Sequence, residues 1–199
     1  MLPDPADPRR PSPAPRRGDA AAAAALVARV ARGDLRAFEA LYRNYHPRLA
    51  RFIGQMAPRR TLVEEVLNDT MLVVWKRGDR YNGQSKVSTW IFAIAYRTTL
   101  KALRQQDEPV DEPDEEPPSD ARSPEQQHSD GQTRAALSRA LAQLSAEHRT
   151  VLVLTYFHDL AQAEIAQIVE CPAETVKTRV FHARRRLRAL LSGEAGDWL

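Results

Sequence analysis

The 199-residue sequence has few of the side chains on which most catalytic and metal sites depend. It contains one cysteine, Cys171, which excludes an intrachain disulfide and fits a reducing cytoplasm. The five histidines are scattered and show no metal-ligand spacing with Cys171, and no glycine-rich phosphate loop occurs. We therefore expect a protein that is not an enzyme, with no catalytic residue, metal, cofactor or small-molecule substrate.

Long apolar runs are missing as well. The longest uncharged apolar run, residues 20–28, is too short and too rich in alanine to span a bilayer. Prolines near the N-terminus stand where a signal peptide would have its apolar core. We expect a soluble, cytoplasmic protein without direct membrane insertion.

The net charge of +3 conceals an uneven distribution. Residues 107–130 hold ten acidic residues and one arginine, and residues 1–25 hold four arginines and three aspartates. The rest of the chain therefore carries a net charge of +11, in two basic blocks joined by the acidic segment. This pattern suggests a polyanionic partner.

Residues 161–191 predict two short helices separated by a tight turn at residues 170–172. Pro172 is suited to open the second helix, where its missing N–H costs nothing. An apolar stripe marks the face of this helix that we expect to be buried: Val176, Val180, Ala183, Leu187 and Leu190. Six cations and no acid occur between Lys177 and Arg188, as a helix in a major groove requires. We interpret the stretch as a DNA-binding helix-turn-helix; the alternative is an amphipathic helix with a solvated basic face.

A second basic helix is expected to begin near Trp90, after a loop signal at residues 82–85. One face of this helix is apolar. The other face combines an aromatic ring and an isoleucine with three cations: Trp90, Ile94, Arg97, Lys101 and Arg104. It suits a single nucleic-acid strand, because cations can follow the phosphates and the ring can stack on an unpaired base. The alternative is that Trp90 belongs to the core and that the cations extend past it into solvent.

Both stretches resemble one family. EIAQIVECPAETVKTRVFHARRRL is similar to promoter-binding region 4 of the extracytoplasmic-function (ECF) sigma factors. LVARVARGDLRAFEALYRNYHPRL and EEVLNDTMLVVWKRGDRYNG resemble region 2 of the same family, in the right order. The resemblance implies an all-α fold, in which a region 2 helical bundle and a four-helix region 4 domain with a helix-turn-helix are joined by a flexible acidic linker. It also implies three partners: bacterial RNA polymerase core, promoter DNA and an anti-sigma factor.

The predicted organisation divides the chain into five segments: a disordered tail (1–25), region 2 (26–105), an acidic proline-rich linker (106–132), region 4 (133–192) and a short tail (193–199). In region 4, Ser145 is expected to cap a helix. Four residues should give that helix its apolar bulk: Val151, Leu152, Leu154 and Tyr156.

The resemblance also implies roles for individual residues. Duplex DNA at the −35 element would be bound by the second helix of the helix-turn-helix: Lys177, Thr178, Arg179, Phe181, His182, Arg184 and Arg185. Of these, Arg179 and Arg184 would contact phosphates. The melted strand of the −10 element would be held by a loop and the helix after it: Tyr81, Asn82, Gly83, Gln84, Ser85, Lys86, Trp90, Arg97 and Lys101. Core polymerase would be bound by one surface of an earlier helix: Glu64, Glu65, Asn68, Asp69, Leu72 and Trp75.

Four departures from the family pattern bear on DNA recognition or helix capping. Arg97 stands where some members carry an asparagine that reads a base, and arginine favours guanine or phosphate instead. Ala161 replaces the usual Ser or Thr helix cap, a loss of roughly 1 kcal/mol. Glu170 and Glu174 put negative charge near the DNA face, where it would weaken or redirect −35 recognition. The alternative function, a stand-alone helix-turn-helix regulator of duplex DNA, leaves the Trp90 face without a role.

Overall fold

The computed structural model describes residues 17–57, 59–106 and 135–195, and every regular element in these ranges is helical, which confirms the all-α prediction. The elements follow one another in this order: α1 (Arg17–Val30), α2 (Leu35–Met56), α3 (Arg60–Lys76), the short 3-10 helix η1 (Gly78–Arg80), α4 (Val87–Gln106), a helix over residues 135–142, α6 (Ala146–Tyr156), α7 (Gln162–Val169) and α8 (Ala173–Ala195). In the described part of the chain, no helix has the length and hydropathy needed to cross a membrane.

The two predicted tails are partly wrong, because helices extend into both of them. α1 begins at Arg17, well inside the tail predicted for residues 1–25. The alanine run at residues 20–25 explains this, since alanine has the highest intrinsic helix propensity. At the other end, α8 continues to Ala195. Residues 1–16 and 196–199 lie outside the described residues, as does the predicted linker apart from Gln106, where α4 ends.

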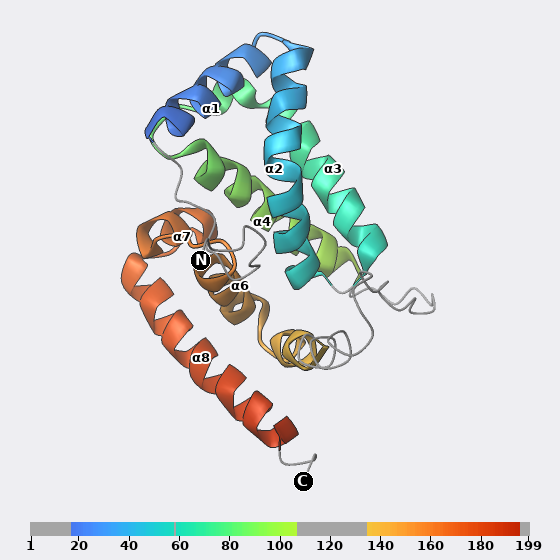
Figure 1. The fold of residues 1–199 in the computed structure, drawn as a ribbon, viewed down its shortest axis with the longest axis vertical. Helices are drawn as coiled ribbons and strands as arrows, with labels where there is room; N and C mark the ends of the chain where they lie inside the picture. The colour runs from blue at the N-terminus through green and yellow to red at the C-terminus, as the bar shows by residue number, and fades with distance from the viewer. Residues whose placement is uncertain (1–16, 58, 107–134, 196–199) are drawn as a thin grey trace, which may run out of the picture.

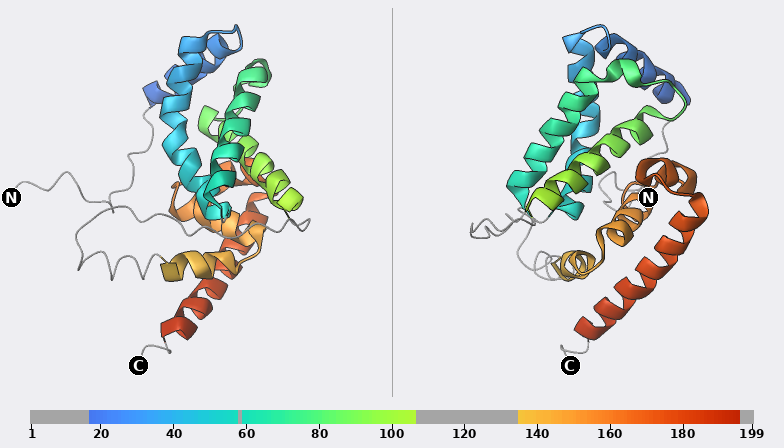
Figure 2. Two further views of the ribbon diagram at one scale, coloured as in Figure 1. Left: turned by 90° about the vertical axis from the view of Figure 1, so that its right-hand side faces the viewer. Right: turned by 180° about the vertical axis from the view of Figure 1, so that it is seen from behind.

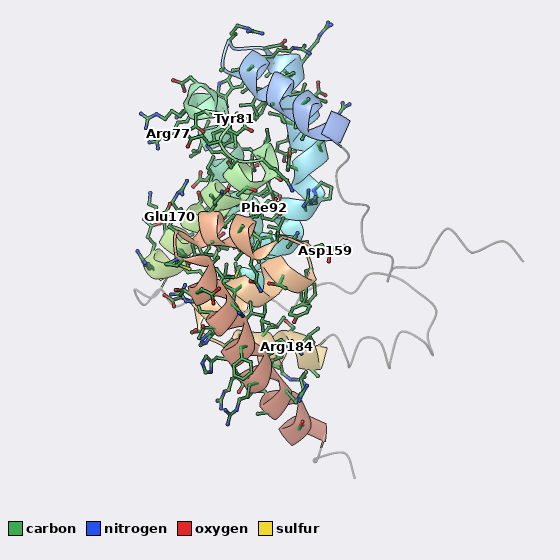
Figure 3. The ribbon with its side chains drawn as sticks, turned by 90° about the vertical axis from the view of Figure 1, so that its left-hand side faces the viewer. Arg77, Tyr81, Phe92, Asp159, Glu170 and Arg184 are labelled. Carbon is green, nitrogen blue, oxygen red and sulfur yellow. The ribbon has the colours of Figure 1, made fainter. Side chains whose placement is uncertain are left out.

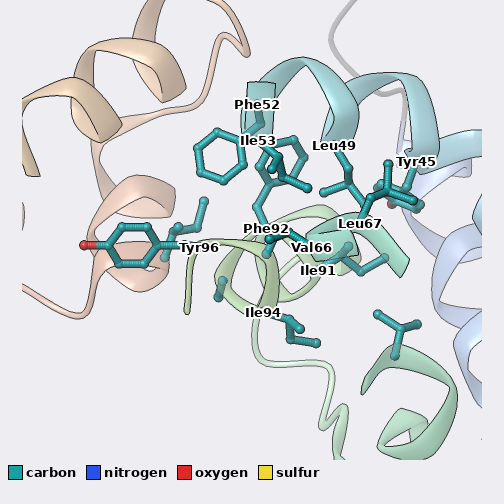
Figure 4. Close-up of a cluster of buried hydrophobic side chains, with 14 of the residues drawn as sticks. Tyr45, Leu49, Phe52, Ile53, Val66, Leu67, Ile91, Phe92, Ile94 and Tyr96 are labelled. Carbon is teal, nitrogen blue, oxygen red and sulfur yellow. The ribbon is translucent and has the colours of Figure 1, made fainter. Parts of the chain in front are cut away.

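α1 to α4 form one helical bundle, and the C-terminal helices lie against one side of it, with α8 pointing away (Figure 1; Figure 2). The bundle core is built from fully buried apolar side chains of α2, α3 and α4: Leu41, Leu49, Phe52, Ile53, Leu67, Met71, Ile91 and Phe92. Figure 4 shows several of these side chains meeting around Phe92. The apolar stripes of α2, α3 and α4 therefore pack against one another.

α6 begins as predicted, because the Ser145 hydroxyl accepts a hydrogen bond from the His148 backbone N–H at 3.3 Å. Val151, Leu152 and Leu154 are buried, also as predicted. The expectation for Tyr156 is wrong, since this residue is 53% exposed. α6 ends at Tyr156, and the chain then turns toward α7.

The two helical units share one hydrophobic core, which nothing in the sequence predicted. A single buried cluster contains Phe92 and Ile94 of α4 together with Leu154 of α6 and Ile165 and Ile168 of α7. Tyr96 reaches from α4 toward the C-terminal helices (Figure 4). In this structure the predicted region 4 is therefore docked on the predicted region 2, and the docking covers part of α4.

Arg149 of α6 joins the two units through backbone carbonyls. Its Nη1 donates to the carbonyl oxygen of Met56, the last residue of α2, at 3.0 Å. Its other hydrogen bonds go to three carbonyls at the end of the 135–142 helix and just beyond: Leu141, Ala142 and Leu144, at 2.8, 2.7 and 3.2 Å. Helix C-termini carry partial negative charge, so one guanidinium satisfies both ends. Burial lowers the pKa of Arg149 from its ordinary value.

His158 fills the space between the two units from the α6–α7 connection. Its ring lies edge-on to Phe52 and Phe92, with centroid separations of 5.9 and 5.0 Å. Burial, with a smaller effect from the cations Arg48 and Arg51, lowers the pKa of His158 from 6.5 to about 4. Docking therefore favours neutral imidazole.

Acidification is accordingly expected to destabilise the docked fold. Because the folded pKa of His158 lies below the unfolded one, its stabilising effect is complete above pH 6.5 and is lost as the pH falls from 6.5 toward 4. Between pH 7 and pH 5 the wild-type free energy of unfolding should fall by about 2 kcal/mol more than that of His158→Leu. Urea unfolding at both pH values measures this difference. The exposed His182→Leu should keep the wild-type dependence, and equal slopes for wild type and His158→Leu would contradict the assignment.

Candidate nucleic-acid interface

The predicted helix-turn-helix is present as α7, a tight turn and α8. α7 ends at Val169 and is capped by Glu170, which has a left-handed backbone with φ of 55°. Ala161 gives α7 no side-chain cap, but Glu164 Oε2 accepts from the Ala161 N–H at 3.1 Å, so half of a capping box remains. The predicted stripe of α8 faces inward, with Val176 and Ala183 completely buried and the other three residues partly so: Val180, Leu187 and Leu190.

The opposite face of α8 is open. Six of the seven predicted −35 residues are exposed: Lys177, Thr178, Phe181, His182, Arg184 and Arg185. Phe181 is 63% exposed, unusual for a large apolar side chain, and its ring lies edge-on to His182 at 5.4 Å. Figure 3 shows Arg184 beside α8, with other side chains projecting outward along the helix. Arg179 differs, since it is 24% exposed and pairs with Glu147 of α6 at 2.8 Å.

The predicted −10 loop has an ordered geometry of its own. The Tyr81 hydroxyl donates to the Ser85 carbonyl at 2.6 Å, and Asn82 Oδ1 accepts from the Gln84 N–H at 3.0 Å. Gly83 has φ of 73°, a conformation that favours glycine. Trp90 is half-buried against Tyr81, with ring centroids 5.4 Å apart. The tryptophan thus serves the core and the surface together. Four loop residues are exposed: Asn82, Gly83, Gln84 and Lys86.

The α4 face after Trp90 is only partly open, which corrects the prediction of one continuous surface. Ile94 is 5% exposed and belongs to the buried cluster that also contains Ile165 and Ile168 of α7. Beyond it, Arg97, Lys101 and Arg104 are exposed. They line a hollow of about 660 Å³ between α4 and α7, whose other lining residues include Tyr96, Leu100, Val169 and Glu170. Two ion pairs cross from α4 and its preceding loop to α7: Lys86–Glu164 at 2.9 Å and Arg97–Glu170 at 2.6 Å.

The predicted polymerase-binding surface lies along α3. Its polar residues and one leucine are exposed: Glu64, Glu65, Asn68, Asp69 and Leu72. Leu72 is 46% exposed, and Trp75 is half-buried, edge-on to Phe38 at 5.2 Å. Among the described residues, no three or more His, Cys, Asp or Glu side chains gather as a possible metal site. α3 thus presents an apolar side chain bordered by acids.

Comparison with known proteins identifies the family. Residues 41–108 match the model of Sigma-70 region 2, and residues 134–187 match Sigma-70, region 4. The ECF RNA polymerase sigma factor RpoE of Cereibacter sphaeroides is 32% identical over 165 residues, covering 80% of this chain and 88% of that protein. The chain belongs to the ECF RNA polymerase sigma factors. It is therefore a DNA-binding factor of transcription initiation that directs RNA polymerase to promoters.

Other relatives agree with this assignment. The RNA polymerase sigma-H factor of Pseudomonas aeruginosa is 29% identical over 173 residues, which cover 81% of this sigma factor and 90% of the relative. Among solved structures, CnrH in complex with the cytosolic domain of CnrY has a TM-score of 0.68 at 24% identity, covering 86% and 98% of the two chains. RpoE of Bartonella quintana, in complex with the anti-sigma factor NepR, has a TM-score of 0.63 at 24% identity, covering 78% and 96%. These two structures share the fold.

Several residues that shape the site were missed from sequence. Arg149, His158 and Glu164 hold the docked arrangement. Glu164 opens the stretch that resembles region 4, but no role was predicted for any of the three residues. The sequence offered one signal for the two acids: Glu164 and Glu170 flank a segment, residues 165–169, that contains no other charged residue. Their cationic partners, however, lie far away in the sequence.

Proposed function

We propose that this sigma factor divides promoter recognition between two surfaces and binds polymerase through a third. α8 would bind duplex DNA at the −35 element. The 81–86 loop with the α4 face would hold the melted −10 strand, and the α3 surface would bind core polymerase. The sigma factor itself would catalyse nothing, since RNA synthesis belongs to the polymerase. The observation that carries the proposal is the exposed cationic face of α8, opposite an inward-facing apolar stripe in which Val176 and Ala183 are fully buried.

The chemistry of α8 supports major-groove binding. A helix fits that groove, and exposed cations along it can replace the counterions of the DNA phosphates. Phe181, 63% exposed, offers an apolar contact of the kind that thymine methyl groups make with proteins. Thr178 and His182 are exposed beside it and supply hydrogen-bonding groups for base edges.

The chemistry of the loop and α4 supports binding of a single strand. Half-buried Trp90 is fixed against Tyr81, so a base that stacked on its open part would meet a ring already held in place. Lys101 and Arg104 are exposed farther along α4 and would follow the phosphates. The bonded geometry of residues 81–85 favours the same use, because a preformed loop loses little entropy on binding.

We also infer an anti-sigma factor as a partner. The solved structure of CnrH contains the cytosolic domain of CnrY, and that of Bartonella quintana RpoE contains the anti-sigma factor NepR.

The division into region 2 at residues 26–105 and region 4 at 133–192 remains our proposal, with α1 now extending region 2 toward Arg17. A cytoplasmic location, beside the polymerase, remains a prediction.

Arg184→Ala is expected to weaken binding of the full-length protein to a labelled, randomised 30-base-pair duplex. Arg184 is exposed on α8 and is proposed to contact a phosphate, so its loss should reduce the slope of log affinity against log salt by about 0.9. Fluorescence anisotropy at several salt concentrations measures the slope. Arg43→Ala removes the same charge from α2, where Arg43 pairs with Glu39, and should leave the slope unchanged. An equal effect of both variants would contradict a role of α8.

A further inference from the structure

α7 occupies the α4 face that the proposed function gives to the melted strand. Ile94, in the middle of that face, is buried in the same cluster as Ile165 and Ile168 of α7. A nucleic-acid strand that follows α4 from Trp90 to Lys101 would cross this position. Because α7 packs on α4 and the two glutamates at its ends pair with Lys86 and Arg97, a strand on this face would have to displace α7.

The contact between α7 and α4 is also electrostatic, and it uses cations proposed to bind the strand. Lys86 Nζ lies 2.9 Å from Glu164 Oε1, and Arg97 Nη1 lies 2.6 Å from Glu170 Oε1. Both glutamates thus sit where strand phosphates would be expected. Their carboxylates satisfy the same cations that phosphate oxygens would satisfy.

One of these pairs joins residues that are far apart in the chain. Arg97 and Glu170 lie 73 residues apart in the sequence yet bond directly. Glu170 holds a left-handed backbone with φ of 55°, which glycine would adopt without strain. Figure 3 shows Glu170 where α7 approaches α4. Glu170 thus places an acidic side chain at a strained backbone position, where it pairs with a cation of the strand face.

We propose that α7 is a built-in competitor for the melted −10 strand, with Glu164 and Glu170 standing in for its phosphates. In the free protein the docked state covers the face, and the strand binds only to the state in which α7 has moved away. The apparent strand affinity is then the intrinsic affinity multiplied by the fraction of open molecules. This proposal rests on the proposed function of the α4 face.

The test measures binding of a 5′-fluorescent, randomised 20-nucleotide single strand to the full-length protein. Glu164→Gln/Glu170→Gln removes both ion pairs but keeps an oxygen that can accept from the Ala161 N–H. Two partly exposed pairs of this kind should shift the opening equilibrium, and with it the strand affinity, by about threefold to tenfold. The matched control Glu39→Gln/Asp159→Asn removes the same charge from exposed positions on α2 and in the α6–α7 connection, outside the two ion pairs, and should change affinity less than about twofold.

Two further variants separate the possible failures. In an Arg97→Gln background, Glu170→Gln should give no gain, because its partner is gone. Lys101→Gln, at an exposed position outside the two pairs, should weaken strand binding in every background. If Lys101→Gln weakens binding but the double glutamine variant gains no more than its control, competition by α7 is overturned and the proposed function stands. If Lys101→Gln has no effect either, the strand face itself is wrong and both fall.

Discussion

Leu72→Arg is expected to reduce the affinity of this sigma factor for RNA polymerase core about 30-fold while leaving thermal unfolding unchanged. Leu72 is 46% exposed on α3, on the surface with Asn68 and Asp69 that we propose meets the polymerase. A leucine buried on binding contributes about 2 kcal/mol, the size of an interface hot spot, and arginine would add a desolvated charge. Titration of labelled protein with core polymerase measures the loss.

The control for Leu72→Arg is the same substitution at Leu35, another strongly exposed leucine. Leu35, at the start of α2, is 69% exposed and lies outside the proposed surface. Leu35→Arg should change polymerase affinity less than twofold. Equal losses for Leu35→Arg and Leu72→Arg, or no loss for either, would contradict the assignment of α3.

Arg149→Met is expected to lower the free energy of unfolding by about 3 kcal/mol, because four carbonyls lose a charged donor and are left partly desolvated. The acceptors belong to Met56 at the end of α2 and to Leu141, Ala142 and Leu144. For a chain of this size the melting temperature should fall by about 6–12 °C. Urea unfolding and calorimetry measure the two quantities.

Arg36→Met serves as the control for Arg149, since Arg36 is exposed on α2. Its effect on unfolding should stay within about 0.5 kcal/mol. A loss below about 1 kcal/mol for Arg149→Met would mean that water replaces the guanidinium, and that the joint between the units is weaker than its hydrogen bonds suggest.

The local features of this fold could be predicted because each has a short-range cause. The stripe of Val176 and Ala183 follows the helical period, and Ser145 caps α6 because a hydroxyl there reaches an unpaired N–H. The helical start of α1 was missed because its alanines have propensity but little apolar pattern. The family resemblance then supplied the order of the two units.

The docking of the two units could not be predicted, because it depends on contacts between distant segments. From sequence, Ile94 looks like part of an open basic face, yet it is buried in the core that the two units share, and His158 looks like an ordinary loop residue. Charged side chains are usually solvated, so nothing in the sequence predicts that Glu170 pairs with Arg97. The structure thus changes the interpretation of α4 from an open surface to a covered one.

Run-off transcription tests the central claim most directly. Bacterial core polymerase and fragmented genomic DNA from the source organism are combined, with and without the purified sigma factor. The account predicts discrete transcripts that depend on the protein and that weaken with Lys101→Gln in α4 and with Arg184→Ala in α8. Absence of such transcripts, together with a shift of duplex DNA by the protein without polymerase, would contradict it and favour a stand-alone regulator.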